Sequence, residues 1–237
     1  MDSQSQKVYA ITGGTGSLGT ALARRLLAEG HKVRAIARGE AAHERLIQAV
    51  GEQPNLSTLV ADVRDLERMR LALKDATDVI HAAAMKSIAL ADYNPAEATR
   101  TNVQGTENVA RAALDCGVER AILVSTDKAV EPITNYGATK QTAERIVLAP
   151  RGRATKFGVC RYGNVIGSQG SVVPLFKRLA KEGKPIPVTD ERMDRFAITL
   201  TFAVDYLLVC ENGFTRRAPI NSSLSFVCQP HFVKLEK

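Results

Sequence analysis

The stretch TGGTGSLG combines residue types that could cradle a dinucleotide. It occupies Thr12–Gly19, between a strand-like and a helix-like segment, and reads as G-x-x-G-x-x-G with Gly13, Gly16 and Gly19. Glycines at this spacing allow a tight turn, let a pyrophosphate approach the backbone, and let the helix pack on the strand. The helix N-terminus then faces the phosphates. A purely structural turn is the alternative, and the strand–loop–helix context favours dinucleotide binding.

The stretch YGATK places Tyr136 and Lys140 four residues apart in a helix-like segment. Positions i and i+4 share one face of a helix, so the ammonium can lie close to the phenol. A nearby cation lowers the pKa of a phenol from about 10 towards neutrality, which makes it a usable general base. Ser125 or Thr126 ends the preceding strand, and Asn102 lies in the helix before it. This combination is the arrangement of short-chain dehydrogenases/reductases, although Y-x-x-x-K alone occurs often by chance.

The end of the second strand indicates which dinucleotide is preferred. An acidic residue is expected there to hold a ribose 2′-hydroxyl, but Ala37 is followed by Arg38, with Arg34 nearby. An arginine suits a 2′-phosphate, so NADP is favoured over NAD. A solvated loop position for Arg38 is the alternative. Asp62 and Val63, after the third strand, are expected along the adenine edge, and Asp62 could instead cap the next helix.

These motifs need a scaffold that brings strand ends together, and the first two thirds of the chain alternate between strand-like and helix-like segments. The strand-like segments are Lys7–Thr12, Lys32–Ala37, Leu56–Val60, Asp78–Ala82, Arg120–Ser125 and Lys156–Arg161. The helix-like segments are Leu18–Glu29, Glu40–Val50, Leu66–Leu73, Pro95–Cys116 and Ala138–Leu148. This alternation predicts an α/β fold, a Rossmann-type doubly wound parallel sheet with helices on both faces.

After Tyr162 the rhythm changes. A glycine-rich loop leads to helices expected at Pro174–Glu182 and Phe202–Cys210, and no periodicity is visible after Gly213. We therefore expect a dinucleotide-binding domain over residues 1–161, a partial substrate-binding lobe over 162–212, and an aperiodic, mobile tail over 213–237.

The composition of the chain indicates which kinds of molecule it could bind. The chain has 237 residues with 32 basic and 25 acidic side chains, a net charge of +7, and only 5% aromatic residues. It has no long basic run, which argues against nucleic acid and leaves a basic surface or a pocket for phosphorylated molecules. No apolar stretch is long enough for a membrane span. The four cysteines are far apart, which argues against a metal site and favours a reducing, cytoplasmic setting.

Five further stretches occur in order and carry a family resemblance. They are HAAAMK (His81–Lys86), STDKAVEP (Ser125–Pro132), NYGATK (Asn135–Lys140), RYGNVIGSQGSVVPLF (Arg161–Phe176) and TDERMDRFAIT (Thr189–Thr199). Together they resemble the inverting UDP-N-acetylglucosamine 4,6-dehydratases, extended short-chain dehydrogenases/reductases of the polysaccharide-biosynthesis group. The resemblance covers about Val8 to Cys210. The Asp127-Lys128 pair separates this family from ordinary 4-epimerases.

The resemblance implies roles for the catalytic residues. Tyr136 takes the proton of the sugar 4-hydroxyl, Lys128 removes the C5 proton, and Asp127 protonates the departing 6-hydroxyl. Such roles require a neutral lysine and a protonated aspartate, so we expect burial and their mutual contact to perturb both. A solvated loop carrying two charges is the alternative. His81, at a strand end, is expected to pack rather than to react.

The same resemblance implies contacts for other positions. Those expected at the cofactor are Gly13, Thr15, Gly16, Ser17, Leu18, Gly19, Arg38, Asp62, Val63, Ala82, Lys86, Tyr136, Lys140 and Val165. Those expected at the sugar nucleotide are Lys86, Thr126, Tyr136, Asn164, Val172, Met193 and Arg195. An arginine opposite a diphosphate is a natural bidentate donor, and a surface position is the alternative for Arg195.

The resulting prediction is NADP-dependent 4,6-dehydration of UDP-N-acetylglucosamine, with inversion at C5, to a UDP-4-keto-6-deoxy-hexosamine. The alternatives are a UDP-sugar 4-epimerase and a truncated cofactor-binding protein with little activity. The family pattern stops near Phe214, so we expect an incomplete C-terminal substrate lobe. The helices at 95–116 and 138–148 resemble a pair that forms a dimer interface in the superfamily, which makes a homo-oligomer possible.

Overall fold

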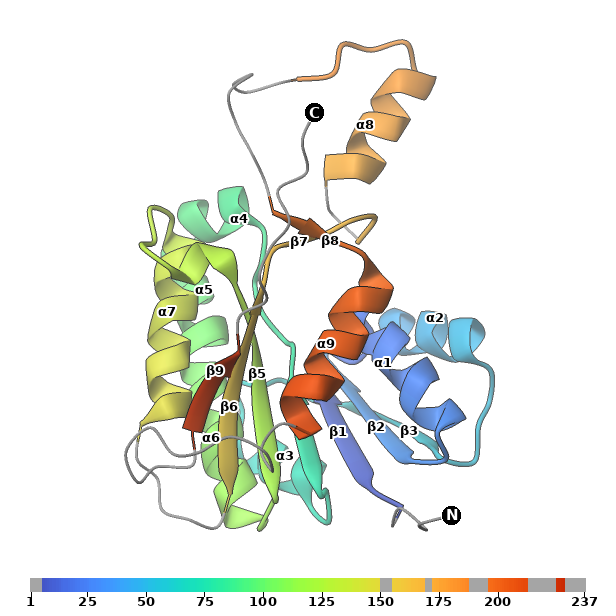
Figure 1. Cartoon of the computed structure of the whole chain (residues 1–237), viewed down its shortest axis with the longest axis vertical. Coiled ribbons are helices and arrows are strands. Elements are labelled where there is room, and N and C mark those ends of the chain that lie inside the picture. The colour runs from blue at the N-terminus through green and yellow to red at the C-terminus, as the bar shows by residue number, and fades with distance from the viewer. Residues whose placement is uncertain (1–5, 150–154, 169–171, 188–195, 213–224, 229–237) are drawn as a thin grey trace.

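The computed structural model describes residues 6–149, 155–168, 172–187, 196–212 and 225–228. Within these ranges seven parallel strands form one sheet in the order β3-β2-β1-β4-β5-β6-β9 (Figure 1). The strands are β1 (Val8–Thr12), β2 (Lys32–Ala37), β3 (Leu56–Val60), β4 (Asp78–His81), β5 (Arg120–Thr126), β6 (Lys156–Tyr162) and β9 (Ser225–Cys228). The doubly wound parallel sheet predicted from the sequence is confirmed.

The direction of winding reverses between β1 and β4. From β1 the chain runs outward through β2 and β3, and it then returns to β4 on the other side of β1 and continues outward. In sheets of this kind a crevice forms where the order reverses, outside the carboxyl ends of the strands. The ends of β1 and β4 therefore mark the expected site.

Helices cover both faces because alternate strand residues point to opposite sides. Tyr9 and Ile11 of β1 pack with α1 (Ser17–Ala28), α2 (Glu40–Val50) and α9 (Leu200–Asn212). Ala10 of the same strand packs in the second core, with α3 (Leu66–Leu73), α6 (Gly105–Asp115) and α7 (Asn135–Leu148). Both faces of β1 are buried, as expected for the centre of a parallel sheet.

Two features of the helical layer differ from the sequence prediction. The short helix α4 (Ile88–Tyr93), whose first turn is capped by the Ser87 hydroxyl, was not expected. The helix expected over 95–116 is divided into α5 (Pro95–Thr99), a π-helical turn η1 (Arg100–Gln104) and α6. A π-turn inserts one residue per turn without breaking the helix, so hydrophobic periodicity does not reveal it. It buries Asn102, whose side chain bonds with the Met85 backbone and with Thr139 of α7.

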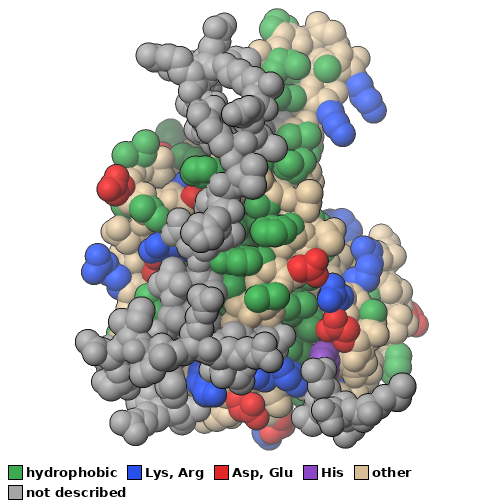
Figure 2. Space-filling model, in the orientation of Figure 1, with side chains coloured by type: hydrophobic (Ala, Val, Ile, Leu, Met, Phe, Trp, Pro, Cys, Tyr) green, Lys and Arg blue, Asp and Glu red, His purple; other side chains and the backbone are tan. Residues whose placement is uncertain are grey.

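The chain beyond β6 is more open. β7 (Asn164–Val165) and β8 (Ala197–Ile198) form a small parallel pair, and α8 (Val172–Lys181) projects beyond the sheet (Figure 1). Figure 2 shows hydrophobic side chains gathered over α9, where Phe202 and Val209 are 47% and 66% exposed. The expectation that no regular element follows Gly213 is wrong for β9, which pairs with β6. Backbone pairing with a strand edge requires no alternation of side chains, so the four residues of β9 show no periodicity in the sequence that would predict a strand.

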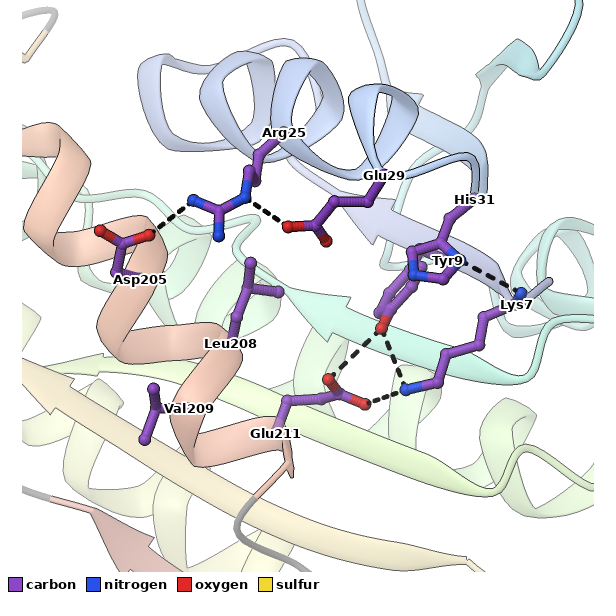
Figure 3. Close-up of a pocket in the computed structure, with 9 residues that line it drawn as sticks. All are labelled: Lys7, Tyr9, Arg25, Glu29, His31, Asp205, Leu208, Val209 and Glu211. Carbon is purple, nitrogen blue, oxygen red and sulfur yellow. Dashed lines mark hydrogen bonds and ion pairs between the residues drawn. The ribbon is translucent and has the colours of Figure 1, made fainter. Parts of the chain in front are cut away.

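A buried ionic cluster fastens α9 to the amino-terminal end of the sheet (Figure 3). We call Lys7, Tyr9, Asp78, Arg120 and Glu211 the basal cluster. Glu211 is 2% exposed and receives the Lys7 ammonium at 3.2 Å and the Tyr9 hydroxyl at 3.3 Å. Arg120 Nε lies 3.0 Å from Glu211 Oε1 and 2.5 Å from Asp78 Oδ1. The cluster thereby joins β1, β4 and β5 to the last turn of α9.

The two carboxyl groups of the basal cluster have pKa values that are shifted in opposite directions. Burial, and then the neighbouring Asp78, raise the pKa of Glu211 to about 7. Burial also opposes ionisation of Asp78, but hydrogen bonds from Arg120 and Glu211 outweigh it and lower the pKa of that carboxyl. Below about pH 7 Glu211 therefore holds a proton, while Asp78 stays ionised.

The basal cluster predicts a pH dependence for the folding of α9. Because the folded state holds a proton on Glu211 that the unfolded chain releases above its ordinary pKa of 4.5, the wild-type free energy of unfolding should fall, relative to Glu211→Gln, as pH rises from 4.5 to about 7. The slope of the difference cannot exceed about 1.4 kcal/mol per pH unit, the limit for one proton. Denaturant unfolding at several pH values measures it.

Leu208→Ala is the matched control for this prediction. Leu208 lines the same hollow of about 360 Å³ between α1 and α9, and its truncation removes no titratable group. Its effect on stability should be the same at every pH. A wild-type minus Glu211→Gln difference that is constant, or that rises between pH 4.5 and 7, would contradict the proton assignment.

Candidate active site

The glycine loop after β1 packs backbone against backbone. The amides of Gly13 and Gly14 both donate to the Ile36 carbonyl, at 2.8 and 3.2 Å. A Cβ atom on Gly13 would lie 2.8 Å from the Ala83 nitrogen, and one on Gly14 would lie 2.8 Å from the Ala35 Cα. Gly13 also has φ +69°, a conformation that side chains disfavour. These positions therefore require glycine.

The two later glycines of the loop have different surroundings. A Cβ on Gly19 would lie 2.5 Å from the Gly14 Cα, so Gly19 lets α1 press against the loop. A Cβ on Gly16 would meet only the Gly13 carbonyl oxygen at 3.3 Å, and no side chain caps this end of α1. The N-terminus of α1 is thus open to an anion over Thr15–Leu18, which are all partly exposed. This cradle fits the pyrophosphate of a dinucleotide.

Arg38 and Asp62 stand next to one another, where the adenosine end of a dinucleotide is expected. Arg38 is 63% exposed, and its Nη1 is 3.9 Å from Asp62 Oδ2. Arg64 holds the Asp62 carboxylate more closely, through Nη2 at 2.6 Å, and its hydrogen bonds lower the pKa of Asp62. Asp62 does not cap α3, because Asp65 accepts the hydrogen bond from the Arg68 amide. Asp62 is thus free of the helix-cap role.

The side chains of two other residues predicted near the adenosine, Arg34 and Val63, make contacts within the protein. The Arg34 guanidinium donates to the carbonyls of Ala72 and Lys74 at the end of α3, so it caps that helix and does not accompany Arg38. The Val63 side chain is 5% exposed and packs in the core beside Gly105. A contact of Val63 with the cofactor stays a prediction, and its side chain serves packing.

The segment from Ala82 to Lys86 crosses the end of the sheet and is held at both ends. Thr12 accepts the Ala82 amide at its carbonyl, at 3.0 Å, and the Ala83 amide at its hydroxyl, at 3.3 Å. Asn102 receives the Met85 amide at 2.8 Å and donates to the Met85 carbonyl at 3.1 Å. The segment therefore lies directly against the glycine loop, with the Lys86 side chain exposed at its end.

Tyr136 and Lys140 lie on α7 as predicted, but their electrostatics differ from the prediction. Burial raises the pKa of Tyr136 to about 12, while a hydrogen bond with Thr126 opposes this rise. Burial lowers the pKa of Lys140 to about 8, and Glu144 opposes that shift. The Lys140 ammonium, 2% exposed, donates to the Val124 carbonyl at 2.7 Å. The expectation that Lys140 brings the phenol towards neutrality is therefore wrong for the free protein, because desolvation dominates.

Of the two hydroxyls at the end of β5, only Thr126 belongs to the site. Ser125 donates its hydroxyl hydrogen to Glu144, which also pairs with Arg161. Thr126 instead bonds with Tyr136, and its hydroxyl donates to Asp127 Oδ1 at 2.9 Å. The alternation of side chains along β5 explains the choice, since neighbouring residues face opposite sides of the sheet.

Asp127 and Lys128 form a contact pair in the short 3₁₀ turn η2 (Asp127–Ala129). Lys128 Nζ is 3.0 Å from Asp127 Oδ1 and 2.9 Å from the amide oxygen of Asn164 on β7. Their side chains are only 20% and 26% exposed, for Asp127 and Lys128 respectively. A solvated loop with two separate charges does not describe this arrangement. The structure brings together Thr126, the pair and Tyr136.

Sequence reasoning missed two glycines that build this site. A Cβ on Gly137 would overlap the Lys128 carbonyl oxygen, so glycine lets the first turn of α7 press against η2. A Cβ on Gly163 would lie 2.5 Å from the Phe196 carbonyl oxygen, beside the pairing of β7 with β8. A glycine inside a helical pattern is itself a signal, because it is unfavourable there without a packing reason.

The remaining predicted contacts lie around β7 and α8. Val165 follows Asn164 on β7 and pairs with Ile198. Val172 is the first residue of α8. Met193 and Arg195 lie outside the described residues.

The described residues contain no group of three or more His, Cys, Asp or Glu side chains arranged to hold a metal ion. None of the helices among these residues combines the length and apolarity that crossing a bilayer would require.

A family model described as "Polysaccharide biosynthesis protein" matches residues 9–217. The chain belongs to this polysaccharide biosynthesis family. The match spans the glycine loop, the Asp127-Lys128 pair and α7, so the family region contains the whole arrangement described above.

Relatives of this chain include proteins named as a dehydratase and as an epimerase. The inverting UDP-N-acetylglucosamine 4,6-dehydratase of Campylobacter jejuni is 44% identical over 211 residues, covering 86% of this chain and 63% of the relative. A UDP-glucose 4-epimerase of Rickettsia rickettsii is 38% identical over 91% of this chain and 67% of its own length. The X-ray structure of Pen from Bacillus thuringiensis superposes with a TM-score of 0.84 at 36% identity, covering 94% of this chain and 70% of that one.

The chain thus spans less than two thirds of the length of the dehydratase that it matches.

The surroundings of the glycines predict opposite outcomes for two alanine substitutions. Gly19→Ala should cost about 3 kcal/mol of folding stability, because its Cβ would collide with backbone that cannot move aside. Gly16→Ala should change stability by less than about 1 kcal/mol. It should nevertheless weaken dinucleotide binding, because its methyl group fills the path of the pyrophosphate. Denaturant unfolding and calorimetric titration with NADP measure the two effects. Unchanged NADP affinity in Gly16→Ala would remove the loop from the binding site.

Proposed function

We propose that this protein is a 4,6-dehydratase of UDP-N-acetylglucosamine that inverts C5 and uses NADP. The observation that carries the proposal is the contact pair of Asp127 and Lys128, which the Thr126 hydroxyl joins to Tyr136. An epimerase needs only the chemistry at C4. A separate acid and base beside the tyrosine have a use in the elimination of water across C5 and C6.

The glycine loop, Arg38 and Lys140 would hold the dinucleotide, and the backbone cradle of the loop fits its pyrophosphate. A dinucleotide held there would supply a hydride acceptor for C4 and, later, a hydride donor for C6. Tyr136 takes the proton of the 4-hydroxyl. Because burial raises the pKa of Tyr136 to about 12, the phenol must release its own proton to solvent before it can act as the base. Lys140, one turn along α7, is the cation that would favour the phenolate.

Lys128 and Asp127 carry the elimination. A shift of the proton between Lys128 Nζ and Asp127 Oδ1, 3.0 Å apart, converts the ion pair into a neutral amine and a carboxylic acid without changing the total charge. The amine then takes the C5 proton, which the C4 ketone has made acidic, while the acid protonates the departing 6-hydroxyl. The ion pair is regenerated and water leaves. Protonation of C5 from the opposite face completes the inversion.

The 4-epimerase is the second candidate, and the similarity to the Rickettsia protein of that name favours it. It would use the same glycine loop and Tyr136 without Lys128. The product separates the two, because dehydration lowers the mass of the UDP-sugar by one water and epimerisation leaves the mass unchanged. A cofactor-binding protein without activity would give neither product.

Three further expectations belong to this proposal. We infer a cytoplasmic location, a homo-oligomer through the helices at 95–116 and 138–148, and a sugar-nucleotide lobe formed from residue 162 onward. The two-part organisation is supported by the small β7–β8 pair, which is separate from the main sheet. The contacts predicted for Asn164, Val172, Met193 and Arg195 with the sugar nucleotide are part of the same proposal.

Substitutions in the pair should separate elimination from cofactor binding. Lys128→Ala and Asp127→Asn should each lower dehydration by about 10²–10⁴-fold, the usual contribution of a general acid or base, while NADP affinity stays near the wild-type value. Tyr136→Phe should stop the reaction earlier, so that no reduced nicotinamide appears in a single turnover. Product mass and absorbance at the nicotinamide band report the two steps. Lys74→Ala, at the end of α3, is the control for loss of a lysine. Wild-type turnover in Lys128→Ala would refute the assignment.

Cofactor preference should depend on Arg38. One charge-assisted hydrogen bond to the 2′-phosphate contributes about 1.5–3 kcal/mol, so NADP should bind roughly ten- to a hundredfold more tightly than NAD. Arg38→Ala should remove this preference and leave NAD affinity unchanged. Arg34→Ala is the matched control, because that guanidinium caps α3 and should not affect the preference. Equal dissociation constants for NADP and NAD in the wild type would contradict this part of the proposal.

A further inference from the structure

His81 lies at the centre of a buried hydrogen-bonded chain beneath the proposed cofactor site. It is the last residue of β4 and is 3% exposed. Its Nδ1 is 2.6 Å from the Thr12 hydroxyl, and its Nε2 is 3.0 Å from the Thr106 hydroxyl. The Thr106 hydroxyl in turn donates to the Asn102 carbonyl at 2.6 Å. One imidazole therefore connects β1, β4, η1 and α6.

The hydrogen bonds of Thr106 determine which ring nitrogen of His81 carries the hydrogen. The single hydroxyl hydrogen of Thr106 is used on the Asn102 carbonyl, which cannot donate. The Thr106 oxygen can then only accept from the ring, so His81 carries its hydrogen on Nε2. Burial, and then the Lys140 ammonium, lower the pKa of His81 to about 3, so the ring has no second hydrogen. Nδ1 is thus an acceptor, and the Thr12 hydroxyl donates to it.

The two ends of this hydrogen-bonded chain hold the segment from Ala82 to Lys86. At one end the Thr12 hydroxyl also accepts the Ala83 amide at 3.3 Å. At the other end the Asn102 side chain holds both backbone groups of Met85. The segment in between packs against the glycine loop, where a Cβ on Gly13 would approach the Ala83 nitrogen to 2.8 Å. The orientation of His81 therefore affects both sides of the place where a dinucleotide would enter.

We propose that His81, held as the neutral Nε2–H tautomer between Thr12 and Thr106, is a positioning residue that sets the separation of the glycine loop from the Ala82–Lys86 segment. The proposal rests on the proposed function only in that the gap between these two elements is taken to bind a dinucleotide. His81 touches no reacting atom. An aliphatic side chain of similar size would fill the space but could not receive from one threonine and donate to the other.

Thr106→Val and Thr106→Ser test the hydrogen-bonded chain in the protein of 237 residues. Thr106→Val keeps the shape but leaves the His81 Nε2–H without an acceptor, and Thr106→Ser restores the hydroxyl. Thr106 is on α6 and 1% exposed, so neither change alters a surface that a dinucleotide could reach. We expect Thr106→Val to weaken NADP and NAD binding alike, by roughly tenfold, the effect of one hydrogen bond. Thr106→Ser should bind within about twofold of the wild type.

Nitrogen-15 spectra of the histidine rings give a readout that needs neither cofactor nor activity. In the wild-type protein at neutral pH, His81 should show a protonated Nε2 in slow exchange and an unprotonated Nδ1. A ring protonated on Nδ1, or on both nitrogens, would overturn the proposal even if Thr106→Val did not fold. So would a folded Thr106→Val that binds both dinucleotides as tightly as the wild type. Absence of dehydration would refute the proposed function and leave these two measurements unaffected.

Discussion

The candidate active site of this protein depends on a contact in which main chain lies directly against main chain. At the end of β1 the glycine loop touches the backbone of both neighbouring strands, with Ile36 receiving its amides on one side and Ala83 meeting Gly13 on the other. Such contacts leave no volume for a side chain and no freedom to adjust. The position of the N-terminus of α1 and the path of the segment after β4 both follow from this contact. The edge formed by the ends of the parallel strands thereby becomes a rigid platform.

The groups proposed to be catalytic are placed on that platform by a second set of close approaches. Gly137 lets α7 lie against η2, so that Tyr136 and Thr126 meet next to the pair of Asp127 and Lys128. Because the two members of the pair have opposite charge, they can share a partly buried place that neither could occupy cheaply alone. Burial raises the pKa of Tyr136 to about 12, because the opposing hydrogen bond with Thr126 offsets the loss of solvation only in part. The free protein thus holds Asp127 and Lys128, the pair proposed to carry the elimination, in contact and the tyrosine protonated.

The elements that follow simple periodicity could be predicted from the sequence, as could the glycine loop and the Tyr136–Lys140 motif. The rest depends on tertiary contacts that no local pattern records. The π-turn around Asn102 keeps the hydrophobic period of a helix, and β9 acquires its identity only by pairing with β6. Arg34 and Arg38 are both arginines near the end of β2, and the sequence does not distinguish their roles. Only the fold shows that Arg34 caps α3. The pKa of Tyr136 depends on how deeply the phenol is buried, which spacing along a helix does not reveal.

The fate of single hydrogens in one turnover distinguishes dehydration from epimerisation. UDP-N-acetylglucosamine carrying deuterium at C4 would be incubated with the protein and NADP, and the product examined by mass spectrometry and proton NMR. Our account predicts loss of one water, deuterium at C6, and a solvent hydrogen at an inverted C5. Retention of the water with deuterium back at C4 of an epimeric hexosamine would contradict it, because Lys128 and Asp127 would then have taken no part in the chemistry.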